Sequence, residues 1–304
     1  MNSTDRRFLI TGATGKTGAA SVRLLRERGH AVTALVRGDD ARARALADLG
    51  ADVVIGDLRD FRDVSTAMRG AEGVYLCYPI EPGLVEVTAN VAQAAAEAGV
   101  DAVVNMSQIS ARREAKSNAA RQHWLAERLL DRSPFRTTHL RPTFFAEWLT
   151  WGWHRDGDSG VLALPFGTGH HAPIAGVDQA YVIAAILERP ASHDRQIYPL
   201  YGPVEMNHYQ IAEIMTRVLG IPVRYEPVDV ESYQAELLTR GLPQHLVQHF
   251  GSVALDYQQG IFAGTNNLVE VIGDHAPMTI EQYVADNRQA FGDAGQFSIR
   301  ASAA

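Results

Sequence analysis

The chain has 304 residues, of which 46% are hydrophobic and 21% are charged, and its formal net charge is -7, a composition typical of a globular protein in water. Its lysines and arginines are scattered, and no apolar run approaches the roughly 20 residues of a membrane helix, so we expect neither a nucleic-acid partner nor membrane association. The N-terminus lacks the pattern of a signal peptide and the single cysteine, Cys77, excludes an internal disulfide, so we expect a cytoplasmic enzyme or nucleotide-binding protein.

Short apolar runs alternate with helical patterns over the first half of the chain. The runs predict buried parallel strands over residues 8–10, 31–36, 52–55, 73–77, 102–106 and 137–140, the last of which breaks at Arg141 and Pro142. Helical patterns lie between them, for example over residues 19–28 and 85–98. This alternation is typical of βαβ units. It predicts an α/β fold with a Rossmann-like, doubly wound parallel sheet that binds its ligand beyond the carboxyl ends of the strands.

The segment TGATGKTG, residues 11–18, follows the first predicted strand. Its Gly-Lys-Thr also ends a nucleoside-triphosphate loop, but such a loop needs a glycine where Ile10 stands. Three glycines at positions 12, 15 and 18 have instead the spacing of a dinucleotide loop: the first permits a tight turn, the second lets backbone approach the pyrophosphate, and the third lets the helix pack closely. The pyrophosphate would sit at the helix N-terminus. We therefore expect cofactor contacts from Gly12, Thr14, Gly15, Lys16, Thr17 and Gly18.

Arg37 stands at the end of the second predicted strand, where an NAD-preferring site presents a carboxylate. Its guanidinium can pair with a 2′-phosphate, which favours NADP(H). Two alternatives stay open: Arg37 is a solvated surface residue, or Asp39 or Asp40 reaches a ribose hydroxyl, in which case the cofactor is NAD(H).

The third and fourth predicted strands also end in residues expected at the cofactor. Asp57, which Leu58 follows, either accepts a hydrogen bond from the adenine amino group or caps the next helix. Cys77, Tyr78 and Pro79 end the fourth strand and should line the cofactor cleft. Cys77 has no basic group placed to activate it, so we expect a small buried residue there.

The pattern changes after about residue 150. The glycine- and proline-rich segment over 160–176 predicts a loop, a helix follows over 178–187, and a strand near 197–198 returns to the sheet. Helical patterns dominate from there to about residue 291. We therefore predict an NAD(P)-binding domain formed by residues 1–150 and 176–203, and a smaller, mainly helical C-terminal lobe on the substrate side formed by residues 151–175 and 204–304.

The pieces FLITGATGKTG, ALVRG, VVIGDL, GVYLCYP, AVVNMSQIS, LRPTFFAEWL and PIAGVDQAYVIAAIL together resemble the NmrA-like branch of the atypical short-chain dehydrogenase/reductase superfamily. The resemblance covers nearly the whole chain. It implies NAD(P) binding. Members of this branch include NADPH-dependent quinone oxidoreductases, a triphenylmethane dye reductase and regulators that sense the nicotinamide ratio without catalysis.

The resemblance also locates the catalytic positions. Short-chain reductases use a Tyr-x-x-x-Lys pair, often with an acidic residue four positions after the lysine. Aligned on Glu127, the chain has Ala119 at the tyrosine position and His123 at the lysine position, which excludes the usual route to ketone reduction. His123 either bonds the nicotinamide ribose, donates a proton, or packs in the core. Ser107 and Gln108 fall at the family's Ser/Thr position beside the nicotinamide, so these three are the catalytic candidates, with Ser107 and His123 also contacting the cofactor.

Aromatic residues after the sixth predicted strand suggest a wall for a flat apolar substrate, although their spacing also suits a helix that packs on the core. One of two adjacent histidines, at 170 and 171, could face this pocket, but neighbours in an extended chain point to opposite sides and no third ligand is near, so we expect no metal. The residues assigned to the substrate pocket are Tyr78, Phe144, Phe145, Trp148, Trp151, His170 and His171.

Two functions fit these features. The first is an NADPH-dependent oxidoreductase that transfers hydride to an electron-poor, apolar small molecule, such as a quinone, a conjugated system or a dye, which needs little proton donation from the protein. The second is a non-catalytic, NADP(H)-sensing regulatory protein of the NmrA type. The aromatic residues favour the enzyme, the replaced tyrosine and lysine favour the sensor, and the chain could act as a monomer or a homodimer.

Overall fold

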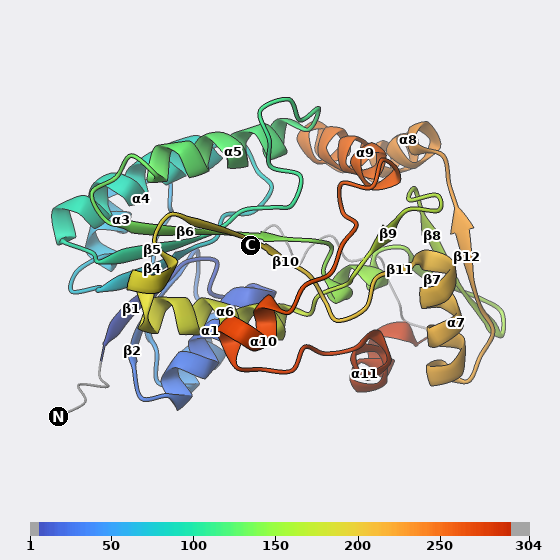
Figure 1. Ribbon diagram of the computed structural model, residues 1–304, viewed down its shortest axis with the longest axis horizontal. Helices are drawn as coiled ribbons and strands as arrows, with labels where there is room; N and C mark the ends of the chain where they lie inside the picture. The colour runs from blue at the N-terminus through green and yellow to red at the C-terminus, as the bar shows by residue number, and fades with distance from the viewer. Residues whose placement is uncertain (1–5, 293–304) are drawn as a thin grey trace.

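A seven-stranded parallel sheet organises the computed structural model, which describes residues 6–292 (Figure 1). The strands lie in the order β10-β6-β5-β4-β1-β2-β3. Their bounds are β1 Arg7–Ile10, β2 Ala31–Val36, β3 Asp52–Ile55, β4 Gly73–Leu76, β5 Ala102–Met106, β6 Arg136–Pro142 and β10 Gln196–Leu200. The predicted doubly wound sheet is confirmed. The expected break at Arg141 is wrong, because β6 stays paired with β10 as far as Pro142 opposite Leu200.

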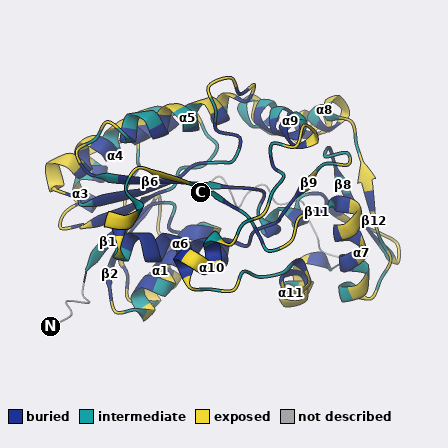
Figure 2. Ribbon diagram, in the orientation of Figure 1, coloured by how far each residue is buried: buried dark blue, intermediate teal, exposed yellow. Residues whose placement is uncertain are grey.

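Helices cover both faces of this sheet (Figure 1). Helices α1 (Lys16–Glu27) and α6 (Gly176–Glu188) pack against each other on one face, and α3 (Phe61–Ala67), α4 (Leu84–Ala98) and α5 (Asn118–Leu130) cover the other. Figure 2 shows α6 as almost entirely buried, and its Ile183, Ile186 and Leu187 have no exposed surface. Two separate apolar cores therefore sandwich the sheet, as the continuous apolar strands require.

The second strand connects to the third through α2 (Ala41–Asp48). Asp40 caps this helix, because its carboxylate accepts the N–H groups of Arg42 and Ala43. Asp39 lies just before it and pairs with Arg44 at 2.9 Å. Both carboxylates considered for a ribose contact are therefore engaged at the start of α2.

The residues predicted to form the C-terminal lobe combine helices with two small sheets in the described part of the chain, to the right in Figure 1. Its strands are β7 Trp153–Asp156, β8 Ser159–Leu164, β9 His170–His171, β11 Met206–Asn207 and β12 Val223–Pro227. Its helices are α7 His208–Leu219, α8 Val230–Thr239, α9 Gln244–Gln258 and α11 Ile280–Asp286, and short 3-10 turns span Ala146–Thr150 (η1), Pro190–His193 (η2, beside the large sheet) and Arg288–Phe291 (η3).

The predicted loop over 160–176 is wrong where β8 and β9 lie. Strands β7 and β8 form an antiparallel hairpin, and β12 pairs with β8 in parallel. The glycine that suggested a loop has a packing role: a Cβ at Gly160 would lie 1.9 Å from the Trp153 ring. Gly160 is therefore needed in the strand because the indole covers it.

Helix α10 (Leu268–Gly273) crosses back from the lobe and packs on α6. Its Val269 and Ile272 join the core beneath the large sheet. Residues 268–273 thus pack with the sheet domain, although the predicted boundary groups them with the lobe. The division into two domains stays a prediction, and residues 293–304 lie outside the described part of the chain.

Candidate functional site

The glycine loop between β1 and α1 has the tight geometry that its spacing predicts. Gly12 has a φ of +56°, a left-handed conformation that favours glycine. A Cβ at Gly18 would lie 2.2 Å from the carbonyl oxygen of Gly12, so no larger residue fits there without moving the loop. Gly15 donates its N–H to the same oxygen at 2.9 Å and starts α1 without a side-chain cap. Such an uncapped N-terminus can bind an anion through its backbone N–H groups.

A pocket opens beside this loop, where β1 lies between β2 and β4. Ligands of doubly wound sheets bind at such a point, because the chain runs from β1 through β2 to β3 on one side and then crosses over to β4 on the other side of β1. We call it the switch-point pocket. Its lining residues are Gly12, Ala13, Thr14, Leu35, Val36, Arg37, Gly56, Asp57, Leu58, Arg59, Cys77, Tyr78, Pro79 and Glu81.

The switch-point pocket thus brings together many of the cofactor residues expected from the sequence. Those that line it are Gly12, Thr14, Arg37, Asp57, Leu58, Cys77, Tyr78 and Pro79, and those that do not are Gly15, Lys16, Thr17, Gly18, Ser107 and His123. Tyr78, which was also expected in the substrate pocket, lines the switch-point pocket. Cys77 is half-buried and lines the pocket, so the expectation of a buried residue is wrong. Burial nevertheless raises the pKa of its thiol, as expected of a residue that no basic group activates.

Charged side chains meet at the mouth of the switch-point pocket. Arg37 lies 3.7 Å from the Glu81 carboxylate. Asp57 accepts the Arg59 N–H at 2.9 Å and the Arg59 guanidinium at 2.7 Å, and these bonds lower the pKa of Asp57. The alternative that Asp57 caps α3 is wrong, since Asp60 holds that position.

Two charged pocket residues, Arg59 and Glu81, were not expected from the sequence. Their positions could have indicated them. Arg59 follows the end of β3 by a few residues, as Asp57 does, and Glu81 follows the end of β4, as Pro79 does. Arg59 adds a second guanidinium to the same mouth as Arg37. The site is therefore richer in charged groups of both signs than the sequence indicates.

The first turn of α1 faces two ways. Lys16 is exposed, whereas the buried Thr17 hydroxyl lies 2.7 Å from the Tyr75 hydroxyl beneath the sheet. Glu147 of η1 accepts the Gly176 N–H at 2.9 Å, and a Cβ at Gly176 would lie 3.1 Å from the Lys16 Cβ. Burial raises the pKa of Glu147, and Lys16 opposes that shift. The Thr17 hydroxyl thus connects the loop to Tyr75 of β4. The exposed Lys16 lies beside η1 and the start of α6.

Beyond β5, Ser107 belongs to a buried polar cluster. Its hydroxyl donates to Glu127 at 2.6 Å, and Arg141 donates to the same carboxylate at 2.8 and 2.5 Å. Ser107 is 4% exposed and Glu127 is fully buried. Ser107 therefore has its proton committed to Glu127, the residue that marks the acidic position of the family pattern.

His123 lies one turn before Glu127 on α5 and is 4% exposed. Burial lowers the pKa of His123 to about 3, with smaller effects from His249 and Arg141. The imidazole is therefore neutral at neutral pH and is no ready source of a proton. Its Nδ1 has no hydrogen-bond partner within residues 6–292.

Gln108 is oriented by a chain of contacts that reaches into the C-terminal lobe. Its Oε1 accepts the Ser110 hydroxyl at 2.7 Å, and Arg112 donates to the Ser110 carbonyl at 3.1 Å. Arg112 in turn makes two bonds, of 2.8 and 2.6 Å, to Asp256 on α9. The Gln108 Nε2 is buried without a partner in the described part of the chain.

Unpartnered buried polar atoms are costly unless a ligand or water meets them. Gln108 follows β5, and in the sheet β4 and β1 lie between β5 and β2, the strand that precedes Arg37; His123 lies on α5, the helix after β5. A dinucleotide runs across this edge of the sheet. Each of these two atoms therefore lacks the partner that a bound ligand or a water molecule would supply.

A second, aromatic pocket lies beyond β6. Trp148 and Trp151 stack with ring centroids 4.6 Å apart, and Phe144 stacks on Phe262 at 4.5 Å. We call it the aromatic pocket. Its lining residues are Phe144, Trp148, Trp151, Leu164, Pro165, Phe166, Tyr233, Phe250 and Val253.

Phe144, Trp148 and Trp151 thus lie where the sequence places them, but Phe145 does not. Phe145 bridges to Ile174 and packs against the core of α1 and α6, because neighbouring residues in extended chain point to opposite sides. Phe166, Tyr233, Phe250 and Val253 come from three distant segments, and no local pattern in the sequence signals them.

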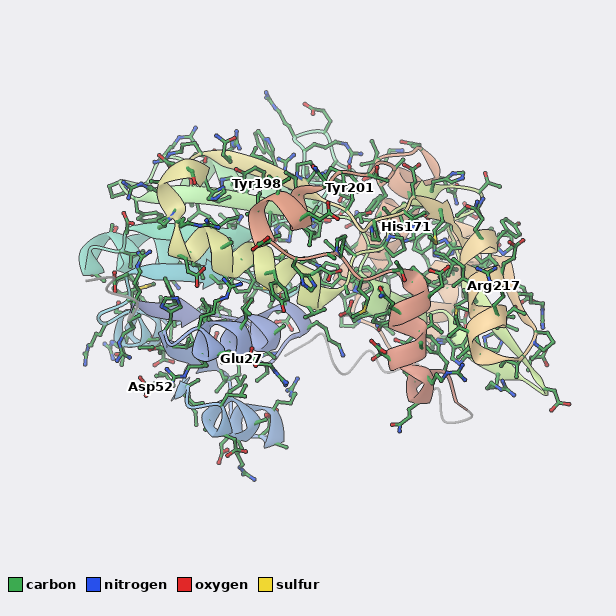
Figure 3. The ribbon with its side chains drawn as sticks, turned by 60° about the horizontal axis from the view of Figure 1, so that its bottom comes forward. Glu27, Asp52, His171, Tyr198, Tyr201 and Arg217 are labelled. Carbon is green, nitrogen blue, oxygen red and sulfur yellow. The ribbon has the colours of Figure 1, made fainter. Side chains whose placement is uncertain are left out.

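The two adjacent histidines also point apart. His170 is exposed. His171 is 2% exposed and its Nδ1 lies 2.7 Å from the Tyr257 hydroxyl, which is 3.3 Å from the His208 Nδ1. Burial lowers the pKa of His171 well below the usual value. Figure 3 shows His171 on the lobe side of the molecule, between Tyr201 and Arg217 in that view.

Neither histidine lines the aromatic pocket; His171 instead backs the ring of Phe144, 6.0 Å away. Across residues 6–292 no three His, Cys, Asp or Glu side chains gather closely enough to hold a metal ion. Within the same residues, every helix is too short or too polar to cross a membrane.

The chain is similar to known proteins over nearly its whole length. The model of the NmrA-like family matches residues 4–298. An NAD(P)H azoreductase of Xenophilus azovorans is 29% identical over 94% of this chain and 100% of its own length. A structure of the NADPH-dependent quinone oxidoreductase of Escherichia coli with NADPH superposes with a TM-score of 0.76 at 25% identity, over 92% of this chain and 99% of that one.

A structure of NmrA, a negative transcriptional regulator, in complex with NAD has a TM-score of 0.79 at 13% identity, over 94% of this chain and 96% of that one. At this identity the likeness shows the fold alone.

Proposed function

We propose that this chain, which belongs to the NmrA-like family, is an NADPH-dependent oxidoreductase that transfers hydride to an electron-poor, apolar small molecule. The family predicted from the sequence is confirmed. The azoreductase and the quinone oxidoreductase, both similar over nearly the whole chain, reduce acceptors of this kind according to their names. These relatives support an NAD(P)H-dependent enzyme with a small-molecule substrate.

The observation that carries the proposal is the order of sites along one edge of the sheet. The switch-point pocket follows β1 to β4, the orphaned Gln108 amide follows β5, and the aromatic pocket follows β6. The strand order β3-β2-β1-β4-β5-β6 makes these positions successive in space. An extended dinucleotide along that edge would direct its nicotinamide toward the aromatic pocket.

Each part of the site has a role in holding the cofactor. The backbone of the glycine loop and the N-terminus of α1 bind the pyrophosphate. Arg37 pairs with the 2′-phosphate, which favours NADP(H) over NAD(H), while Gln108 and His123 supply polar contacts at the nicotinamide end. When bound, NADPH supplies the hydride.

The protein's own groups provide little acid catalysis. Ala119 takes the place of the tyrosine that short-chain reductases use, the Ser107 proton is committed to Glu127, and His123 is neutral. An electron-poor acceptor tolerates this, because its reduced form can take a proton from water. The site therefore favours acceptors that can be reduced by hydride transfer without a proton donor from the protein.

A non-catalytic sensor of NADP(H) is the second candidate, and the replaced tyrosine and lysine favour it. The aromatic pocket favours the enzyme, because a sensor needs no apolar pocket beyond the nicotinamide end. The net charge of -7 supports the expectation of no nucleic-acid partner. A single cysteine agrees with a cytoplasmic location.

The test is steady-state oxidation of NADPH with a panel of quinones, azo dyes and enones. We expect turnover with at least one class and a lower kcat/KM for Trp148→Ala, while Trp153→Phe, a change at a tryptophan outside the aromatic pocket, keeps the wild-type value. Tight NADPH binding without turnover of any acceptor would instead establish the sensor.

A further inference from the structure

The lining of the aromatic pocket contains no charged side chain. All nine residues are aromatic, aliphatic or proline, and the Tyr233 phenol, whose pKa burial raises to about 12, stays neutral. The rings of Trp148 and Trp151 are stacked and nearly parallel, with 10° between their planes, and Phe250 meets Trp151 edge-on at 5.2 Å. The pocket therefore offers flat ring faces and no ion partner.

Several ionisable groups on the surrounding elements are paired or neutral. On α9, Asp256 is bound to Arg112, and burial lowers the pKa of His249 to about 4. On η1, the Glu147 carboxyl accepts the Gly176 N–H and has a pKa raised by burial.

The same holds on the other two sides of the pocket. On α8, Glu236 pairs with Arg240 one turn along the helix. Behind Phe144, burial keeps His171 neutral. None of these groups therefore presents an unpaired charge that could compensate a charge on a ligand.

Moving an ion from water into apolar surroundings without a partner is strongly unfavourable. A neutral ring system does not pay this desolvation free energy, and it can stack on the indole rings of Trp148 and Trp151. From this geometry we infer that the aromatic pocket accepts uncharged, planar aromatic acceptors and rejects sulfonated and cationic ones. The inference rests on the proposed reductase function and names its substrate class.

Matched pairs of acceptors test this selectivity. 1,4-Naphthoquinone is compared with its 2-sulfonate, and a neutral aminoazobenzene with its sulfonated analogue, by kcat/KM for NADPH oxidation. We expect kcat/KM to fall by at least about tenfold on sulfonation. Equal values for the members of each pair, or a preference for the sulfonates, would overturn the inference.

A variant pair assigns the selectivity to the pocket. Trp151→Lys places a cation in the lining and should reduce the preference for the neutral quinone by about tenfold. Val204→Lys adds the same charge at a residue that is 51% exposed and outside the pocket, and should leave the preference unchanged. A preference unaltered in Trp151→Lys, or altered equally in both variants, contradicts the inference.

Quenching of tryptophan fluorescence by the same quinones measures binding without turnover. Quenching of the wild type by the neutral quinone alone, with Trp148→Ala reducing it, supports the pocket's selectivity even if no acceptor is reduced. Selective quenching without turnover would contradict the reductase function but would leave the inferred selectivity of the pocket intact. Equal saturable quenching by the neutral and the sulfonated quinone would overturn the inference whatever the variants do.

Discussion

Arg112 and Asp256 form a two-bonded ion pair that joins the loop after β5 to α9, with distances of 2.8 and 2.6 Å. The Asp256 side chain is 4% exposed, whereas that of Arg112 is 33% exposed. Nearby, the Ser117 hydroxyl lies 2.8 Å from the His249 Nδ1, also on α9. Helix α9 carries Phe250 and Val253 into the aromatic pocket, so these bonds fix one wall of that pocket relative to Gln108.

Loss of Arg112 should cost more stability than loss of Asp256. Arg112→Ala leaves a buried carboxylate without a partner, and we expect the free energy of unfolding to fall by about 3 kcal/mol. Asp256→Ala leaves a guanidinium that water can reach, and we expect a loss of about 1 kcal/mol. Urea unfolding measures both. Arg224→Ala, which breaks exposed ion pairs, is the control and should change stability by less than about 1 kcal/mol; equal losses for Arg112 and Asp256 would contradict the asymmetry.

Two glycines of the loop should separate folding from cofactor binding. Gly18→Ala places a Cβ 2.2 Å from the Gly12 oxygen, so we expect a stability loss of about 1–3 kcal/mol and weaker NADPH binding. Gly15→Ala meets the same oxygen at 3.2 Å and should lose less stability, but it should still weaken NADPH binding by obstructing the pyrophosphate. Thermal unfolding and NADPH fluorescence titration give the two values. Unchanged binding in Gly15→Ala would remove that residue from the site.

Arg37 should decide the preference between the two nicotinamide cofactors. Arg37→Gln removes the charge-assisted bonds to a 2′-phosphate, so we expect the Kd for NADPH to rise by about tenfold or more while the Kd for NADH stays the same. Arg44→Gln, a change at an exposed arginine on α2 paired with Asp39, serves as the control and should alter neither. Equal weakening of both cofactors would assign Arg37 a structural role.

Buried histidines should make the fold sensitive to acid. Burial lowers the pKa of His208 to about 3 and that of His249 to about 4, from an ordinary value of 6.5. The unfolded chain therefore binds more protons than the folded protein between these values. The stability that the neutral imidazoles provide is fully present above about pH 6.5 and is lost as the pH falls toward the folded pKa values.

His208→Gln should accordingly reduce the fall in Tm between pH 7 and about pH 5, because glutamine does not titrate in this range. Thermal unfolding followed by circular dichroism measures it. His154→Gln, at an exposed histidine, should keep the wild-type pH dependence. A pH dependence identical in the wild type and His208→Gln would exclude His208 as a source of the acid sensitivity.

Much of the cofactor site follows from local pattern. Gly12 and Gly18 stand at positions where the backbone turn and the approach of α1 leave no room for a side chain, so their spacing alone indicates the loop. Arg37, Asp57 and Tyr78 follow apolar runs, and parallel strands bring their carboxyl ends to one edge. Local pattern misled where a residue serves packing: Gly160 looked like a loop residue because the indole that covers it cannot be read from its neighbours.

By itself, the sequence determined the parallel sheet, the glycine loop and the family, because each depends on residues a few positions apart whose spacing follows backbone periodicity. The tertiary structure alone decided that Phe145 leaves the aromatic pocket, that His171 is buried while His170 is exposed, and that His123 is neutral. It also brought Phe250 to Trp148, and Asp256 to Arg112 across 144 positions. Such contacts depend on how whole elements pack, and no local spacing encodes which distant side chains share a cavity.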